Sequence, residues 1–205
     1  MERSAIILAG GSSTRLGQDK GLAQLAGKSL INHVLDRTKN LVEETLVVVS
    51  SKGQAEKYEK VSGTDTRIII DNAEVHGPLV GAIVGFGEAS GTYSLLLPCD
   101  APFISKDILQ LLLELCINKN AVIPRWPNCY IEPLQAVYCT EAAIRASKEA
   151  VSSGEVKMQA MVDKLRGVRY ISTLVLEQLD PGLNTFINVN TVFDLKKAEA
   201  LVKRR

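Results

Sequence analysis

Residues 5–20 of the chain read A-I-I-L-A-G-G-S-S-T-R-L-G-Q-D-K, an apolar run that ends in a loop rich in glycine and hydroxyl side chains. Glycine in such a loop lets backbone N–H groups approach phosphate oxygens closely, because a Cβ would clash and would disfavour positive φ angles. We therefore interpret the segment as a β-strand followed by a phosphate-binding loop, with Gly10 and Gly11 as its contact surface.

Two basic residues of the same segment, Arg15 and Lys20, can bring positive charge to a triphosphate. One pair of opposite charges about 4 Å apart near a protein surface contributes roughly 4 kcal/mol at an effective dielectric constant of ~20, before desolvation. The loop matches neither G-x-x-x-x-G-K-[ST] nor G-x-G-x-x-G, which disfavours a P-loop kinase and a dinucleotide dehydrogenase. A plain strand-ending turn is the alternative interpretation of the two glycines.

The bulk composition is that of an ordinary globular domain, with 205 residues, 46% of them hydrophobic and 23% charged. This length suits one domain over residues 1–205. A net charge of +1 gives no reason to expect nucleic acid as a partner, and no apolar stretch reaches the ~18 residues of a membrane span. We expect a cytoplasmic protein with neither a nucleic-acid nor a membrane partner.

Short β-branched runs alternate with stretches of helical periodicity along the chain. This alternation is typical of parallel strands joined by crossover helices, and it predicts an α/β fold with a mostly parallel central sheet. Strands are expected over 5–9, 45–49, 67–70, 94–97, 121–123, 133–138 and 168–172. Helices are expected over 30–41, 77–88, 105–116 and 141–151, and from 191 to the basic end. Residues 124–132 are expected to form a loop that can lie over the site.

Gly10, Asp71 and Asp100 each follow the end of a predicted strand. Ligands of open α/β sheets bind outside the carboxyl ends of the strands, so these three positions should face one crevice. Asp100 is the candidate metal ligand, because Mg²⁺ prefers one or two carboxylates together with substrate phosphates and water. Capping of the following helix is the alternative role for Asp100, and a simple Asp-Asn turn is the alternative for Asp71.

Asn188 and Asn190 alternate along a segment expected to be extended, so both amides should point to one face. An amide offers donors and acceptors together, which suits recognition of a heterocycle. Capping of the last helix is the alternative role for these asparagines. Thr191 and Asp194 fit the S/T-x-x-D/E pattern that begins a helix.

The segment Leu8–Lys20 resembles the L-A-G-G-x-S-x-R-x-G-x-D-K signature of the MobA family, the molybdenum cofactor guanylyltransferases. The resemblance continues through L-P-C-D-A-P at 97–102 and F-I-N-V-N-T at 186–191. It implies a three-layer Rossmann-like nucleotidyltransferase fold and Mg²⁺-dependent transfer of GMP from GTP to Mo-molybdopterin, with release of pyrophosphate. Transient contact with proteins that deliver or accept the cofactor is also expected.

The resemblance also implies roles for individual residues. It makes Arg15, Lys20 and Asp100 catalytic, with Asp100 as the Mg²⁺ ligand, and Asn188 and Asn190 the acceptor-binding pair. The nucleotide-binding set that it implies is Leu8, Ala9, Gly10, Gly11, Lys20, Asp71 and Asp100.

The family often has an asparagine after the second strand that contacts the nucleotide, but this chain has Ser50-Ser51-Lys52 there. The resemblance therefore says least about how the base or ribose is recognised. A related cytidylyltransferase that acts on the same or another phosphorylated acceptor is the first alternative, although Leu8 favours the guanylyl branch. A non-catalytic nucleotide sensor or cofactor chaperone is the second alternative.

Overall fold

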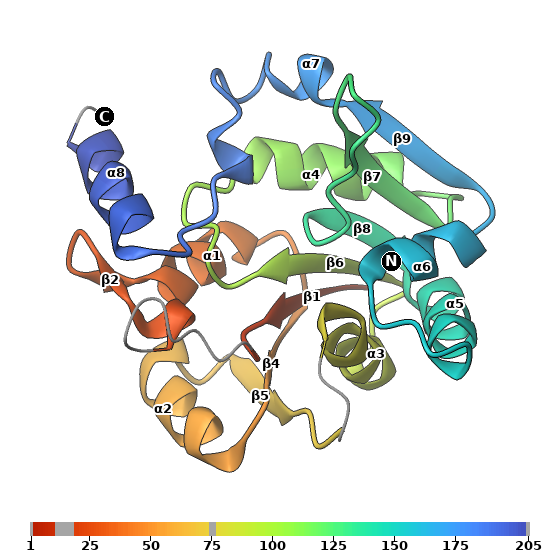
Figure 1. Ribbon diagram of the computed structural model, residues 1–205, viewed down its shortest axis with the longest axis horizontal. Helices are drawn as coiled ribbons and strands as arrows, with labels where there is room; N and C mark the ends of the chain where they lie inside the picture. Colours follow the sequence, from red (N-terminus) through yellow and green to blue (C-terminus); the bar gives the residue numbers. More distant parts are fainter. Residues whose placement is uncertain (1, 11–18, 74–76, 204–205) are drawn as a thin grey trace.

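The computed structural model describes residues 2–10, 19–73 and 77–203, and a seven-stranded sheet runs through its centre (Figure 1). Among the described strands of this sheet, β8 alone runs antiparallel to its neighbours β6 and β7, and every other pairing is parallel. The sheet is therefore mostly parallel, as the alternation of sequence patterns predicts. In spatial order the strands are β5 (Thr66–Ile70), β4 (Glu44–Val49), β1 (Arg3–Leu8), β6 (Tyr93–Pro98), β8 (Ala136–Cys139), β7 (Ala121–Arg125) and β9 (Val168–Ser172).

Helices cover both faces of the sheet and complete a three-layer α/β architecture (Figure 1). One face carries α1 (Leu30–Thr38), α2 (Lys52–Ser62), α4 (Lys106–Leu115) and the short α7 (Thr173–Leu176). The other carries α3 (Pro78–Glu88), α5 (Thr140–Ser152) and α6 (Met158–Lys164). None of the helices in the described ranges combines the length and apolar character needed to cross a membrane.

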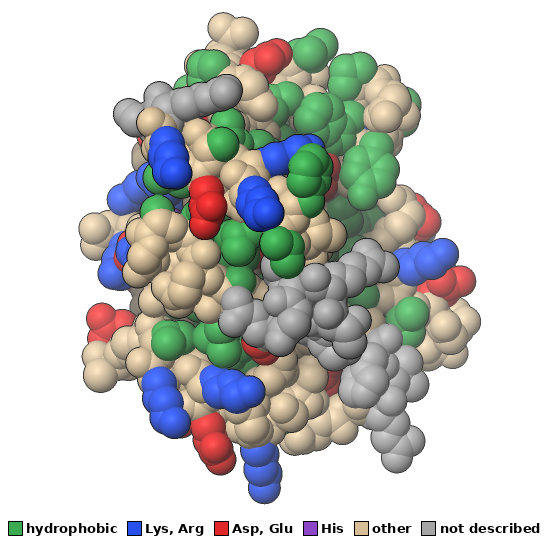
Figure 2. Space-filling model, turned by 60° about the vertical axis from the view of Figure 1, so that its left-hand side comes forward, with side chains coloured by type: hydrophobic (Ala, Val, Ile, Leu, Met, Phe, Trp, Pro, Cys, Tyr) green, Lys and Arg blue, Asp and Glu red, His purple; other side chains and the backbone are tan. Residues whose placement is uncertain are grey.

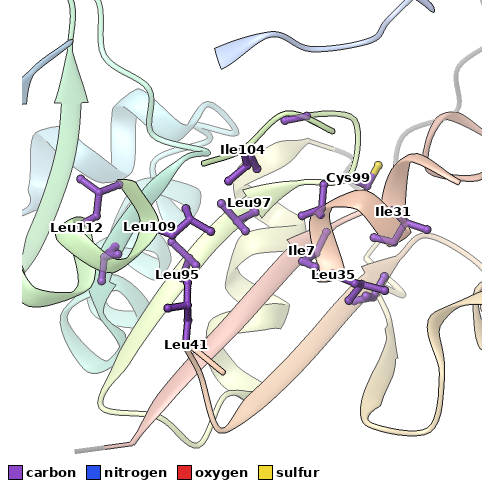
Figure 3. Packing of buried hydrophobic residues seen from close by; sticks show 14 of the residues in the cluster. Ile7, Ile31, Leu35, Leu41, Leu95, Leu97, Cys99, Ile104, Leu109 and Leu112 are labelled. Carbon is purple, nitrogen blue, oxygen red and sulfur yellow. The ribbon is translucent and has the colours of Figure 1, made fainter. Parts of the chain in front are cut away.

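The strands divide their side chains between the two layers by simple alternation. Ile7, Leu95 and Leu97 belong to the core cluster under α1 and α4, whereas Ile6 and Leu96 belong to the cluster under α3 and α5. Figure 3 shows the first cluster, in which Leu109 and Leu112 of α4 and Ile31 and Leu35 of α1 meet these strand residues. Full burial of one such side chain stabilises the folded state by about 1.5–3 kcal/mol, so packing against the helices stabilises both faces of the sheet.

A further helix, α8 (Val192–Val202), lies apart from the sheet and packs on a hairpin formed by β2 (Gln24–Leu25) and β3 (Lys28–Ser29) (Figure 1). The chain reaches α8 from the short turn η3 (Asn184–Phe186). It passes along the carboxyl edge of the sheet, where the Val189 N–H donates to the Asp100 carbonyl at 2.8 Å. This path brings the last part of the chain to the ends of β1 and β6.

Two predicted boundaries are wrong by three residues. The strand expected over 133–138 begins only at Ala136, because the preceding residues form a turn in which the Gln135 N–H donates to the Glu132 carbonyl at 3.2 Å. The helix expected over 30–41 ends at Thr38, since Asn40 takes a left-handed conformation with φ of 62°.

Candidate active site

A cavity of about 780 Å³ opens at the carboxyl ends of β1, β4 and β6. This volume lies within the range of small-molecule pockets. Gly11 and Arg15 lie outside the described residues. The predicted site residues that line the cavity are Leu8, Ala9, Gly10, Lys20, Asp71, Asp100, Asn188 and Asn190. The structure therefore brings together residues from the beginning, middle and end of the chain, and for Gly10, Asp71 and Asp100 this confirms the strand-end argument.

Hydrogen bonds between neighbouring strand ends hold the floor of this cavity. The Ala9 N–H donates to the Val48 carbonyl at 2.8 Å, and the Cys99 N–H donates to the Leu8 carbonyl at 3.1 Å. On the far side of β4, the Asp71 N–H donates to the Val49 carbonyl at 2.7 Å. These bonds extend the parallel ladder one residue beyond the strands.

Lys20 connects two of the other predicted residues. Its Nζ donates to Asn190 Oδ1 at 2.6 Å and lies 3.5 Å from Asp100 Oδ2. The side chain of Lys20 is 27% exposed and that of Asp100 is 11% exposed, so the pair faces the cavity from a largely buried position. Figure 2 shows one face of the molecule, on which Lys and Arg side chains are spread among acidic and neutral ones.

Asp100 does not cap the helix that follows it. That helix, α4, has Ser105 as its N-cap, whose hydroxyl accepts from the Ile108 N–H at 3.5 Å. Burial raises the pKa of Asp100, and attraction by the Lys20 ammonium offsets only part of that rise. A largely buried carboxylate beside a cavity is a costly arrangement, which is typical of a functional group.

The fit of a metal to this site can be judged from the donor set. Within the described part of the chain, no three His, Cys, Asp or Glu side chains cluster in a way that holds a metal ion. A protein cage for Zn²⁺ or Ca²⁺ is therefore not formed by those residues. One carboxylate such as Asp100 is nevertheless what Mg²⁺ needs when phosphates and water supply its other ligands.

Asp71 is buried at the end of β5, and one of its oxygens forms the turn that its sequence suggests. Its Oδ1 accepts from the Ala73 N–H at 3.0 Å. Gly81 also lines the cavity, beside Leu8 and Asp71, and a Cβ added there would lie 3.7 Å from Leu8 Cδ2 and 4.0 Å from Asp71 Oδ2, which is ordinary van der Waals contact.

Asn188 and Asn190 both line the cavity, whereas Val189 between them is buried against α8 and the β2–β3 hairpin. The predicted alternation is confirmed. Their side chains do not cap the last helix, because Thr191 and Asp194 form its capping box.

Three further polar residues line the cavity, namely Ser50 and Ser51, which directly precede α2, and Gln54 in its first turn. Ser50 and Ser51 lie where the resemblance places a nucleotide-contacting asparagine in the family. Gln54 was not expected, because the polar stretch around it carries no recognisable motif. Conversely, residues 124–132 do not line the cavity, although Leu134 just beyond them does. Trp126 packs instead edge-on against Phe186, with ring centroids 5.5 Å apart.

Comparison with known proteins shows which family this chain matches. The model of the MobA-like NTP transferase domain matches residues 5–168. A Methanosarcina mazei protein named "Probable molybdenum cofactor guanylyltransferase" is 33% identical over 199 residues, covering 95% of this chain and 88% of its own. A Pyrococcus horikoshii protein with the same name is 33% identical over 202 residues, covering 95% and 98%.

Solved structures show the same architecture. The crystal structure of molybdopterin-guanine dinucleotide biosynthesis protein A from Archaeoglobus fulgidus has a TM-score of 0.83 at 27% identity, covering 98% of this chain and all of its own. A 2-C-methyl-D-erythritol 4-phosphate cytidylyltransferase from Thermus thermophilus has a TM-score of 0.73 at 18% identity, covering 99% and 100%. The second likeness shows only the shared fold, so the fold alone does not select the nucleotide base.

Proposed function

The chain belongs to the MobA-like NTP transferase family, and on this premise we propose that it transfers GMP from GTP to the terminal phosphate of Mo-molybdopterin. Relatives named molybdenum cofactor guanylyltransferase, similar over most of the chain, support this reaction. The structural observation that carries the proposal is the meeting of Lys20 and Asp100 in a cavity large enough for a nucleotide.

The proposed reaction is a displacement at phosphorus. An oxygen of the acceptor phosphate forms a bond to the α-phosphorus of GTP, and the bond from that phosphorus to the oxygen bridging to the β-phosphate breaks. The electron pair of the broken bond leaves with pyrophosphate, and molybdopterin guanine dinucleotide remains. Because the attacking oxygen is already anionic, no side chain has to remove a proton. Catalysis then rests on alignment and on stabilisation of developing charge.

We assign different roles in this reaction to the residues around the cavity. Lys20, with the backbone of Gly10, is proposed to bind the triphosphate, and Lys20 would exchange its contacts with Asn190 and Asp100 for phosphate oxygens. The predicted roles of Gly11 and Arg15 on the same phosphates remain predictions. Asp100 would hold Mg²⁺, which offsets the charge that builds on the leaving pyrophosphate.

The other residues that line the cavity are proposed to bind the nucleoside of GTP and the pterin of the acceptor. Leu8 and Ala9 end β1 beside Asp71, and these three are proposed to contact the nucleoside. Asn188 and Asn190 lie across the cavity and are proposed to bind the pterin of the acceptor, since their amides offer both donors and acceptors.

Two measurements test this function. Isothermal titration with GTP and with CTP in Mg²⁺ compares the two bases, and GTP is expected to bind more tightly. A pyrophosphate-release assay with GTP and the molybdenum cofactor then tests turnover, which Lys20→Ala and Asp100→Ala should each lower by orders of magnitude while the fold is retained. Tighter binding of CTP would transfer the proposal to a cytidylyltransferase. Binding without pyrophosphate release would point to a non-catalytic sensor.

A further inference from the structure

Gln54 and Tyr58 lie four residues apart on α2 and therefore on one side of the helix. Ser50 lies just before the extended N-cap Ser51 and is joined to Gln54 by a hydrogen bond. We call Ser50, Gln54 and Tyr58 together the α2 clamp. All three residues bond, directly or through one another, to segments that carry the proposed phosphate ligands.

At one end, the α2 clamp holds Gly10, the second residue after β1. The Ser50 hydroxyl donates to the Gly10 carbonyl at 2.6 Å. Ser50 is itself held, since its N–H donates to Gln54 Oε1 at 2.8 Å. A side chain at Gly10 would meet the Ser50 hydroxyl, because an added Cβ would lie 2.5 Å from its Oγ. The orientation of the Gly10 peptide is therefore set by α2.

At the other end, the α2 clamp holds Asp19. Gln54 Nε2 donates to Asp19 Oδ2 at 2.6 Å, and the Tyr58 hydroxyl donates to Asp19 Oδ1 at 2.5 Å. Asp19 is the N-cap of the short turn η2 (Lys20–Leu22), where its Oδ1 also accepts from the Gly21 N–H at 3.2 Å. Both carboxylate oxygens are thus engaged, which fixes the backbone from which Lys20 extends.

Tyr58 is completely buried and lies behind Asp19. Burial raises the pKa of its hydroxyl, and the neighbouring Cys99 and Asp19 raise it further, so the hydroxyl stays protonated as a donor. A Cβ at Gly21 would overlap this hydroxyl and would lie 3.2 Å from Cys99 Sγ, which leaves no slack in the packing. Tyr58 is not among the described residues that line the cavity, so any effect on a ligand must pass through its neighbours Asp19 and Cys99, of which Cys99 lines the cavity.

We propose that the α2 clamp positions the phosphate site, because α2 and the residue before its N-cap fix Gly10 and Lys20 relative to one another. The inference rests on the proposed function in one respect, namely that these two residues bind phosphate. Ser50, Gln54 and Tyr58 are positioning residues in this proposal. A misplacement of about 1 Å in a preorganised site can lower a rate about 100-fold. Loss of a hydrogen bond that positions Asp19 can therefore weaken the function of the phosphate site.

The test removes one hydroxyl and uses a ligand without a base. Tyr58→Phe is compared with the control Tyr93→Phe. Tyr93 is also buried, but it lies at the start of β6, at the end of the strand away from the cavity. Its hydroxyl accepts from the Asn118 N–H at 3.0 Å. Tripolyphosphate with Mg²⁺ and guanosine are titrated separately into each variant. Tyr58→Phe should bind tripolyphosphate about 10-fold or more weakly and guanosine as the unaltered protein does. Tyr93→Phe should bind both ligands normally.

Asp19→Asn, which removes a carboxylate acceptor of the α2 clamp at a residue that is not among the described residues lining the cavity, provides a second variant, expected to show the same selective loss, should Tyr58→Phe fail to fold. Unchanged tripolyphosphate binding in these variants, or equal losses for tripolyphosphate and guanosine, would overturn the proposal. The outcome is separable from that of the proposed function. An unaltered protein that binds tripolyphosphate but prefers CTP refutes guanylyl transfer alone, whereas full GMP transfer by Tyr58→Phe with unchanged tripolyphosphate binding refutes the α2 clamp alone.

Discussion

At the scale of a single residue, Asp100 is a carboxyl group whose burial opposes its ionisation. Its pKa is raised by burial despite the nearby Lys20 ammonium. A raised carboxyl pKa means that the folded state prefers the protonated form. Ionisation of Asp100 therefore costs stability above its folded pKa, and this cost disappears as the pH falls through that value.

Replacement of Asp100 by a neutral isostere should separate stability from activity. Asp100→Asn is expected to melt at the same temperature as the unaltered protein or a few degrees higher at pH 7, since about 1 kcal/mol shifts the melting temperature of a domain of this size by about 2–4 °C. Pyrophosphate release should nevertheless fall at least 100-fold. Asp107→Asn is the matched control, because this exposed aspartate lies in the first turn of α4, where a negative charge stabilises the helix. A clear loss of thermal stability in Asp100→Asn would show that the ionised group is structural.

At the scale of elements, the beginning of α8 determines where Asn190 lies. Asp194 Oδ2 accepts from the N–H groups of Asn190 and Thr191, at 3.2 and 2.9 Å, and from the Thr191 hydroxyl at 2.8 Å. The Thr191 hydroxyl accepts in return from the Asp194 N–H at 3.1 Å. These hydrogen bonds, that from Thr191 foremost, hold the pKa of Asp194 below its usual value. One box thus caps the helix and positions a cavity residue.

Loss of this box should lower the stability of the protein by an amount that depends on pH. Asp194→Ala is expected to cost about 1 kcal/mol, the usual effect of removing a cap. Because the folded pKa is lowered, the contribution of Asp194 is present at neutral pH and disappears as the pH falls through that folded value. Melting curves at pH 7 and pH 3 measure both effects, and the two proteins should differ less at pH 3. An equal difference at both pH values would contradict the role of the carboxylate.

The elements differ in how far the sequence predicts them. β1, β4 and β6 are apolar on both faces, as central parallel strands must be, and their ends identify Gly10 and Asp100 without further information. The helix α2 is not predicted because only Ala55 and Tyr58 of its residues are buried, which is too narrow a stripe to give a helical period.

The same reasoning explains which parts of the site remain hidden in the sequence. Strand ends are local features, so Gly10, Asp71 and Asp100 can be placed together from topology alone. The bonds from Gln54 and Tyr58 to Asp19 join residues 35 and 39 positions apart and depend on how α2 packs. Neither spacing nor composition encodes that packing, and the roles of the cavity residues stay predictions until they are measured.

At the scale of the whole molecule, the cavity joins three distant parts of the chain. Lys20 comes from near the amino terminus, Asp71 and Asp100 from the middle, and Asn190 from the segment before the last helix. The hydrogen bond from Lys20 to Asn190 joins residues 170 positions apart, and Lys20 also forms an ion pair with Asp100. A ligand that bridges these segments should therefore stabilise the entire fold rather than one loop.

GTP with Mg²⁺ should accordingly raise the melting temperature of the protein. A ligand at 100 times its dissociation constant stabilises the folded state by about 2.7 kcal/mol, which corresponds to an increase of roughly 5–10 °C for a domain of this size. The increase should be smaller with CTP at the same concentration, and smaller when EDTA replaces Mg²⁺. Lys20→Met should abolish most of it, because the variant lacks the cation proposed to bind the phosphates. Lys28→Met is the control, since Lys28 pairs with Asp36 outside the cavity and its loss should leave the ligand effect intact. An equal increase in Lys20→Met and Lys28→Met would mean that the triphosphate binds elsewhere.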